Sequence, residues 1–255
     1  MAHPPEPNRS TPNRQRLDEA LVARGLYPSR SRARDAVMRG TVSVDGAVET
    51  KPARAVSENA RIAVGDGAQA YVSRAALKLK HGLLHFGIEV NGLVCLDIGA
   101  STGGFTQVLL EAGAAHVTAI DVGHGQMARE IADDRRVTVI EGVNARDLSA
   151  DQLASPPELI VCDVSFISLK LALPAALRLA APHATLVALI KPQFEAGREA
   201  IGKGGVVSDP AVHAAVCLAA STFLEESGWA VVGLTPSPIA GGDGNHEFLI
   251  AARKA

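Results

Sequence analysis

Patterns that mark several protein classes are missing from this sequence. Only 4% of the 255 residues are aromatic, and the three cysteines form no CxxC pair. Because Cys95, Cys162 and Cys217 all lie among apolar residues, we expect reduced, buried thiols rather than disulfides or a zinc site. His81 and His85 are spaced four apart on a predicted helix, but no third ligand is visible, so we predict no metal site.

Long apolar runs are also missing. Residues 1–13 are polar and rich in proline, which is unlike the apolar core of a signal peptide and predicts a disordered tail. The most apolar stretch, residues 171–190, is interrupted by two prolines, an arginine and a histidine, so no membrane span is expected. Reduced cysteines and the lack of a secretion signal predict a cytoplasmic protein.

Neither sign of charge is in marked excess, since 25 lysines and arginines stand against 27 aspartates and glutamates. The signs are nevertheless distributed unevenly along the chain. Residues 1–80 carry 14 basic and 8 acidic side chains, a net charge of +6, whereas residues 81–255 carry 11 and 19, a net charge of −8. This asymmetry predicts two modules with different partners.

The first module, residues 14–64, has the pattern of a small, basic α+β domain. Two helical patterns end near Gly25 and Gly40, and glycine is a common stop signal for helices. The alternating segment TVSVDGAVET predicts a hairpin around Asp45 and Gly46, because both central residues of such a turn take positive φ. Residues 65–72 are predicted to be a linker.

The second module, residues 73–255, contains seven short apolar runs, from LVCLDIG to HEFLIAA, most of which alternate with helical patterns. Continuous apolar runs are typical of strands that are buried on both faces. Their alternation with helices predicts a mostly parallel, doubly wound sheet. Only PSPIAGGDGN separates the last two runs, so we expect the last strand to return antiparallel.

A glycine-rich turn at residues 97–105 ends the first run. A dinucleotide-binding GxGxxG motif would need glycine where Ser101 stands, and the Gly-Lys-Ser/Thr of a P-loop is missing. An acidic residue followed by a glycine loop suits a nucleoside without a pyrophosphate, although a plain tight turn between strand and helix would give the same pattern. Asp121 ends the second run, where its carboxylate could accept the ribose hydroxyls of that nucleoside or cap the next helix.

Two charged residues end later runs, Asp163 the fourth and Lys191 the fifth. Either residue alone is more typical of a helix cap or a solvated lysine. At the common rim of a parallel sheet, the pair could hold an ammonium group near a substrate hydroxyl. Spacing alone does not connect Lys78 or Glu247 to this rim.

Six motifs occur in order along the chain: SRAALKL, DIGASTGGFT, VCDVSFIS, LIKPQFEAGRE, KGGVVSDP and GNHEF. Together they resemble the TlyA family, in which a domain like that of ribosomal small-subunit protein four precedes an FtsJ-like methyltransferase domain. The resemblance covers residues 14–253. It implies an α/β fold, namely a Rossmann-like S-adenosylmethionine (SAM)-dependent methyltransferase domain with a seven-stranded, mostly parallel sheet, preceded by a small α+β RNA-binding domain. Some members are labelled haemolysin.

The resemblance also implies a chemistry: SAM as methyl donor, and ribosomal RNA or ribosomal subunits as substrate, methylated at the 2′-oxygen of cytidine. The family's catalytic Lys-Asp-Lys-Glu tetrad maps onto Lys78, Asp163, Lys191 and Glu247. The implied cofactor-binding residues are Asp97, Gly99, Ala100, Ser101, Thr102, Gly103, Gly104, Phe105, Asp121, Val122 and Asp163. The residues expected to contact RNA phosphates, unless they form an ordinary solvated helix face, are Arg14, Arg16, Arg30, Arg32, Arg34 and Arg39.

These residue types suit the implied reaction. A ribose hydroxyl is a poor nucleophile, so a base must take its proton as the oxygen attacks the sulfonium methyl. Lysine can be that base if desolvation and a like-charged neighbour lower its pKa. Lys191 with Lys78 nearby would supply this arrangement, with Asp163 and Glu247 orienting the two ammonium groups.

Three other functions stay open. An enzyme that methylates the amino group of a base would carry the motif Asp/Asn-Pro-Pro-aromatic, where this chain has DVSF. An enzyme that methylates carbon 5 of cytosine would need a nucleophilic cysteine, whereas Cys162 lies in a predicted strand. A membrane-active haemolysin would need an exposed amphipathic or spanning element, and none stands out. A non-catalytic RNA-binding or ribosome assembly factor could keep the same fold. Residues 195–210 form either a lid or a flexible connection.

Overall fold

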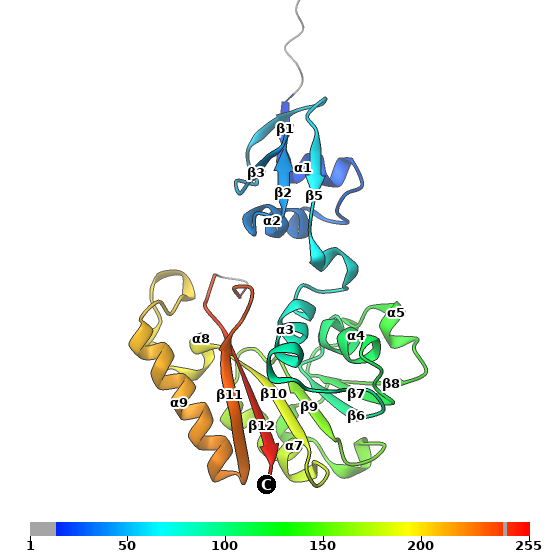
Figure 1. The fold of residues 1–255 in the computed structure, drawn as a ribbon, viewed down its shortest axis with the longest axis vertical. Helices are drawn as coiled ribbons and strands as arrows, with labels where there is room; N and C mark the ends of the chain where they lie inside the picture. The colour runs from blue at the N-terminus through cyan, green and yellow to red at the C-terminus, as the bar shows by residue number, and fades with distance from the viewer. Residues whose placement is uncertain (1–13, 242–243) are drawn as a thin grey trace, which may run out of the picture. The chain divides into compact units, whose positions relative to one another are not determined.

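The chain is described by a computed structural model for residues 14–241 and 244–255, and it divides into two compact units between Gln69 and Ala70 (Figure 1). The tail predicted at residues 1–13 lies outside the described residues. Within the described part, no helix is both long and apolar enough to cross a membrane.

The first unit is a small α+β domain. Its helices and strands are β1 (Arg14–Arg16), α1 (Leu17–Ala23), α2 (Arg30–Met38), β2 (Val42–Val44), β3 (Ala47–Glu49), β4 (Ala55–Ser57) and β5 (Ile62–Val64). β1 pairs with β4, and β3, β2 and β5 form an antiparallel sheet. Asp45 and Gly46 connect β2 to β3 with φ of 53° and 88°, which confirms the predicted hairpin. Small and aliphatic side chains from both helices and the strands form one core.

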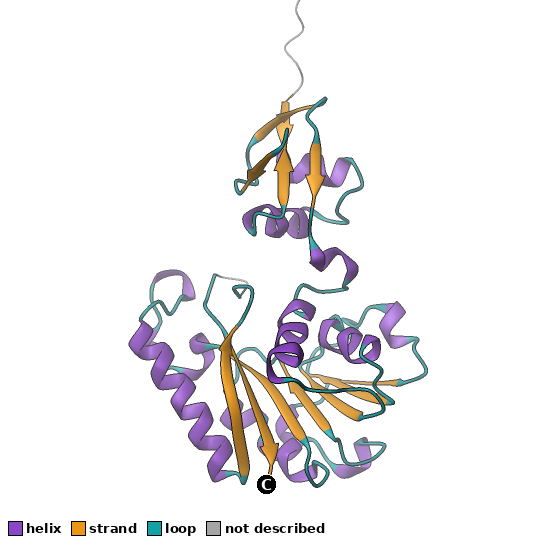
Figure 2. Cartoon of the chain, in the orientation of Figure 1, coloured by secondary structure: helices purple, strands orange, loops and turns teal. Residues whose placement is uncertain are grey.

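The second unit is built on one seven-stranded sheet (Figure 2). Its strands are β6 (Val94–Ile98), β7 (His116–Asp121), β8 (Val137–Glu141), β9 (Leu159–Cys162), β10 (Thr185–Ile190), β11 (Trp229–Pro236) and β12 (Phe248–Lys254). The order is β11-β12-β10-β9-β6-β7-β8. β6 to β10 pair in parallel, whereas β12 pairs antiparallel with both β10 and β11. Both the mostly parallel sheet and the antiparallel last strand are therefore confirmed.

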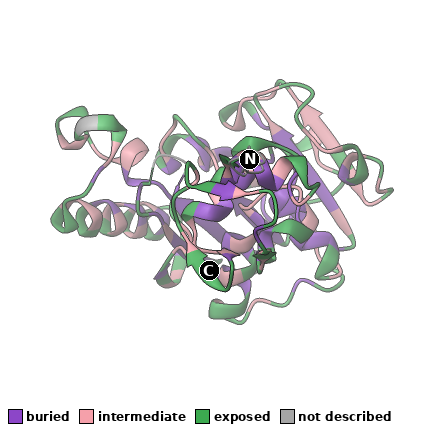
Figure 3. Cartoon of the chain, turned by 90° about the horizontal axis from the view of Figure 1, so that it is seen from above, coloured by how far each residue is buried: buried purple, intermediate pink, exposed green. Residues whose placement is uncertain are grey.

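Helices cover both faces of this sheet. They are α3 (Ala76–Phe86), α4 (Gly104–Glu111), α5 (Arg129–Ala132), α6 (Leu169–Ala172), α7 (Pro174–Leu179), α8 (Pro192–Glu195) and α9 (Pro210–Glu226). Short 3₁₀ turns are η1 (Gly67–Ala70), η2 (Ala145–Asp147), η3 (Ala150–Gln152), η4 (Arg198–Ala200) and η5 (Lys203–Gly205). Side chains of β10 alternate between two cores. Leu186 and Ala188 pack beneath α6, α7 and α9, whereas Val187 and Leu189 pack beneath α3 and α4. This alternation explains the continuous apolar runs and the buried strands (Figure 3).

The three cysteines are free, as expected. Cys95 and Cys162 are buried in strands, and burial raises the pKa of each thiol to about 12. Cys217, on α9, is only partly buried. A Cys162 thiol with such a pKa is not a ready nucleophile, which argues against the cytosine carbon-5 chemistry.

Candidate active site

The glycine-rich turn after β6 brings two strand ends into contact. Gly99 has a φ of +82°, and a Cβ added there would lie 2.8 Å from the backbone oxygen of Asp163, which follows β9. Only glycine fits that space and takes that conformation without strain. Ser101, with a φ of 46°, completes the tight turn into α4.

Asp97, the last acidic residue before the turn, is fully buried. The hydroxyl of Thr106 on α4 donates to its Oδ2 at 2.6 Å, while Oδ1 has no partner within the described part of the chain. Burial raises the pKa of this carboxyl group to about 7. The Asp97 side chain thus connects the end of β6 to α4 through the Thr106 hydroxyl.

Asp121 ties the turn to the neighbouring strand. Its Oδ2 accepts the backbone N–H of Ser101 at 2.8 Å, and its Oδ1 accepts that of Gly123 at 2.7 Å. The parallel register of β6 and β7, with Ile98 opposite Ile120, places Asp121 beside the turn. Each carboxylate oxygen keeps a further lone pair for a ligand.

A cleft of about 910 Å³ opens at the carboxyl ends of β6, β7 and β9. Small-molecule sites typically enclose about 300–1,000 Å³ and lie at this edge of a doubly wound sheet. The predicted cofactor residues that line the cleft are Gly99, Ser101, Asp121, Val122 and Asp163. Those that line an adjoining pocket of about 220 Å³ include Ala100, Thr102, Gly104 and Phe105. Asp97 and Gly103 line neither.

Lys191 and Asp163 form one pair of the predicted tetrad. The Lys191 Nζ lies 2.6 Å from the Asp163 Oδ1, and it also donates to the Ser165 Oγ at 2.9 Å. Lys191 follows β10 and is only 8% exposed. All three residues line the smaller pocket, so the buried side-chain nitrogen of Lys191 lies beside the glycine-rich turn.

Lys78 and Glu247 form the other pair, with 2.5 Å between Nζ and Oε2. Both side chains are buried. α3 packs against β10 and β12 because Gly82 has no side chain: a Cβ there would meet Val187 at 3.3 Å and Leu249 at 3.6 Å. Lys78 lies one helical turn before Gly82 on the same face, so its side chain reaches Glu247 ahead of β12.

The strand register brings the two pairs to one rim. Ile190 of β10 stands opposite Phe248 of β12 in antiparallel pairing. The next position along this register sets Lys191 against Glu247. Sequence spacing did not connect Lys78 and Glu247 to the rim, because their placement depends on a helix packing contact and an antiparallel return.

Two aromatic residues at the cleft were missed by the sequence analysis. Phe166 is 91% exposed, and its ring centroid lies 5.0 Å from that of Phe194 on α8. Phe166 has a φ of 65°, which is a strained value for a bulky residue and is typical of functional sites. Both rings line the cleft. The available signal was an aromatic residue directly after DVS in a chain with few aromatics.

The predicted RNA-contacting arginines differ in their surroundings. Arg14 and Arg34 are exposed, whereas Arg32 donates to the Ala68 carbonyl. Arg16 and Arg30 are both ion-paired with Asp18 at the surface of the first unit.

The guanidinium of Arg39 is ion-paired with two acidic residues. Its guanidinium donates two hydrogen bonds to Asp66, at 2.9 and 2.7 Å, and one to Asp35 at 2.8 Å. Tyr27 also donates to Asp66, whose side chain is buried. Arg39 therefore has a structural role, and Asp66, assigned to a linker by the sequence analysis, belongs to the packing of the first unit.

Within the segment of residues 195–210, Gly205 and Val207 are held by hydrogen bonds to Asn245. The Asn245 side chain accepts the backbone N–H of Val207 at 2.9 Å and donates to the Gly205 carbonyl at 3.0 Å. Asn245 and Val207 are both fully buried. Residues 205–207 are therefore anchored to the rest of the unit and do not form a freely moving lid.

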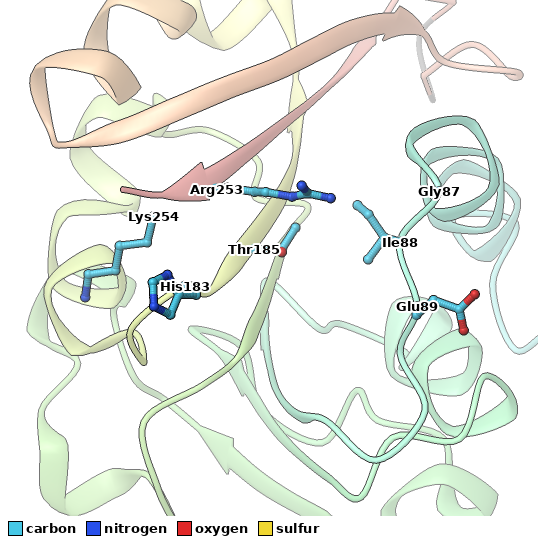
Figure 4. A pocket seen from close by; sticks show the side chains of 7 residues that line it. All are labelled: Gly87, Ile88, Glu89, His183, Thr185, Arg253 and Lys254. Carbon is cyan, nitrogen blue, oxygen red and sulfur yellow. The ribbon is translucent and has the colours of Figure 1, made fainter.

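A second hollow, of about 520 Å³, lies elsewhere on the unit (Figure 4). Thr185 and Arg253 line it, and they are register partners at the beginning of β10. Lys191 follows the carboxyl end of β10, whereas the hollow lies at the amino end of β10. The hollow and the tetrad therefore lie at opposite ends of this strand.

A doubly wound sheet with a nucleoside-sized cleft and a strand-end glycine turn is typical of Rossmann-like methyltransferases. A model of FtsJ-like methyltransferases matches residues 71–254, and a model of S4 domains matches residues 15–62. The chain belongs to the FtsJ-like methyltransferase family, with an S4 domain at its amino-terminal side. The resemblance and the fold class inferred from the sequence are thereby confirmed.

Named relatives extend this result. The chain is 47% identical to the 16S/23S rRNA (cytidine-2'-O)-methyltransferase TlyA of Mycobacterium tuberculosis (strain CDC 1551 / Oshkosh), over 94% of this chain and 90% of that protein. It is 41% identical to Hemolysin A of Brachyspira hyodysenteriae, over 92% and 98% of the two chains. A solved structure named as a hemolysin, from Streptococcus thermophilus, is 38% identical with a TM-score of 0.75, covering 96% of this chain and 90% of that one.

Proposed function

We propose that this chain is a SAM-dependent methyltransferase that modifies the 2′-oxygen of cytidine in ribosomal RNA. The observation that carries the proposal is the placement of Lys78, Asp163, Lys191 and Glu247 at the rim that also bears the nucleoside-sized cleft. The named activity of the M. tuberculosis relative supports the substrate, since that relative is 47% identical over nearly the whole chain.

The cleft fits the nucleoside part of SAM. Gly99 lets the turn approach closely, and Ser101 and Asp121 offer polar atoms at the position where ribose hydroxyls would lie. Ile98, Val122 and Leu171 line the cleft with apolar surface for a flat base. When bound, SAM supplies an activated methyl group on a sulfonium, and the smaller pocket beside Lys191 is where the chain would present it.

The tetrad supplies the proton chemistry. The ribose 2′-oxygen forms a bond to the methyl carbon as the sulfur–carbon bond breaks, and the electron pair of that bond stays on sulfur. The neutral amine of Lys191 accepts the proton that the 2′-hydroxyl loses. Asp163 stabilises the ammonium that results, and the Lys78–Glu247 pair sets the charge around it.

The first unit would hold the RNA. The family model that matches this unit is that of S4 domains. The exposed side chains of Arg14 and Arg34 offer positive charge to RNA phosphates. Net charge of +6 over residues 1–80 favours a polyanionic partner. Acting on ribosomal RNA or ribosomal subunits places the proposed enzyme in the cytoplasm.

Mapping of 2′-O-methylation tests the proposal. Ribosomal subunits from cells lacking this protein are incubated with purified protein and SAM, and nuclease digestion with mass analysis locates each methyl group. Ribose-methylated cytidine is the expected product. A methyl group on a base, or no methylation of either subunit, would overturn the proposal.

The hemolysin names of some relatives lead to a separate test. Purified protein is added to dye-filled liposomes at the concentration that supports methylation. We expect no dye release. Release that persists in a Lys191→Ala variant would establish a membrane activity independent of the tetrad.

A further inference from the structure

The amine of Lys191 has two contacts of different kinds within the described structure. Its Nζ is 2.6 Å from the Asp163 Oδ1, yet no hydrogen bond of suitable geometry reaches that oxygen. The contact with the Ser165 Oγ, at 2.9 Å, does have hydrogen-bond geometry. Asp163 therefore supplies charge to the amine, while the direction of an N–H bond is set by Ser165.

We propose that Ser165 is a positioning residue that orients the Lys191 amine so that its lone pair faces the ribose hydroxyl. This inference rests on the proposed function. A lysine ends in a compact group on a flexible four-carbon stem, so charge attraction alone leaves its rotation free. A hydrogen bond to the Ser165 hydroxyl limits that freedom and leaves the remaining tetrahedral directions of the nitrogen toward Asp163 and the substrate.

Ser165 has the location that this role needs. It is one of the few residues that line both the larger cleft and the smaller pocket, together with Gly99, Ser101 and Asp163. The Lys191 amine is thus held at the junction of the two cavities. That junction is where a methyl group from one cavity and a hydroxyl from solvent-exposed RNA would have to meet.

The loop that carries Ser165 is itself fixed against the segment after Lys191. The Phe166 ring packs on the Phe194 ring at 5.0 Å. The Glu195 Oε1 accepts the backbone N–H of Leu169 at 2.7 Å, and Glu195 is partly buried. Residues 163–169 and 191–195 are therefore joined by two further contacts, which restrain the exposed Ser165 relative to the amine.

The hydroxyl rather than the bulk of the side chain should matter. Threonine keeps the hydroxyl, and valine has the shape of threonine without it, so Ser165→Thr and Ser165→Val form a matched pair. A misplacement of about 1 Å can cost about 100-fold in rate. We expect Ser165→Ala and Ser165→Val to lower the single-turnover rate constant by about 10- to 100-fold, and Ser165→Thr to stay within a few-fold of the wild type.

The experiment measures single-turnover methylation of ribosomal subunits and, separately, SAM affinity by calorimetry. Ser227→Ala serves as control, because the Ser227 hydroxyl donates to the Phe223 carbonyl at the end of α9, away from the tetrad. The expected result is a lower single-turnover rate constant in the alanine and valine variants, rescue by threonine, and SAM affinity within a few-fold of the wild type.

Other outcomes separate the two proposals. A wild type that methylates ribose while the alanine and valine variants match its rate overturns the role of Ser165 and leaves the proposed function intact. Equal rate losses in all three variants, with weakened SAM binding, would make Ser165 a cofactor contact instead. A wild type that transfers no methyl group to ribose overturns the proposed function itself.

Discussion

Lys78 and Glu247 are separated by 169 positions in the chain, yet the Lys78 Nζ and the Glu247 Oε2 are 2.5 Å apart. Lys78 is 6% exposed and Glu247 is 4% exposed, so the two charges are removed from water together. A buried charge is costly unless its partner is present. Each residue therefore depends on the other for the stability of the fold.

A double-mutant cycle checks this dependence. Lys78→Met or Glu247→Met alone leaves one buried charge without its partner and should lower the free energy of unfolding by about 3–5 kcal/mol. The double variant should recover most of that loss, measured by urea unfolding, but should not recover methylation. Additive losses of stability in the double variant would show that the two charges are not coupled.

The role of Lys191 is tested by removing its amine. We expect Lys191→Ala to lower single-turnover methylation by about 10²–10⁴-fold, the usual contribution of a general base, with SAM binding retained. Lys191→Gln keeps hydrogen-bond donors for Ser165 and Asp163 and covers the case in which the alanine variant does not fold. Lys254→Ala, at the opposite edge of the sheet, is the control. Full activity in both Lys191 variants would contradict the assignment.

Asp97 should give the fold a distinctive dependence on pH. Burial raises the pKa of this carboxyl group from 3.8 to about 7. Between these values the folded state binds a proton that the unfolded state has released, so stability from this group falls as pH rises from about 4 to 7. Asp97→Asn should remove that component, on the order of 4 kcal/mol. Urea unfolding of both proteins from pH 4 to 8 measures it; parallel curves would be inconsistent with the shift.

The exposed arginines of the first unit should act through charge. Arg14→Ala and Arg34→Ala should weaken binding of ribosomal RNA, and each lost phosphate contact should reduce the slope of log affinity against log salt by about 0.7 to 0.9. Arg253→Ala is the matched control, because it removes a positive charge from the second unit, beside the beginning of β10 and away from the tetrad. An unchanged slope in the double variant would exclude these two residues from the RNA interface.

The strands and one edge of the site could be predicted from sequence because they depend on local patterns. Continuous apolar runs predicted the buried strands, and parallel strand ends predicted that Asp163 and Lys191 would share a rim. Lys78 and Glu247 could not be placed in this way. Their meeting depends on the close approach of α3 to the sheet at Gly82 and on the register of β12, which are both long-range features.

Charge patterns were a weaker guide than apolar patterns. Arg39 belongs to a basic run, which predicted a phosphate contact, but its actual partner is Asp66, 27 positions away. Asp97 ends an apolar run just as Asp163 does, and nothing local shows that one is buried under α4 while the other faces the cleft. Phe166 was overlooked because exposure and a left-handed backbone cannot be seen in residue order.

The contact between Gly99 and the Asp163 backbone joins the two halves of the proposed chemistry mechanically. The cofactor turn and the segment that carries the acid partner of Lys191 touch at one backbone position, with no room for even a methyl group. A side chain at position 99 would push both apart in a single movement. In the proposed reaction, a substitution at Gly99 would therefore change both the binding of the methyl donor and the position of the acid partner of Lys191, and neither could be adjusted alone at this position.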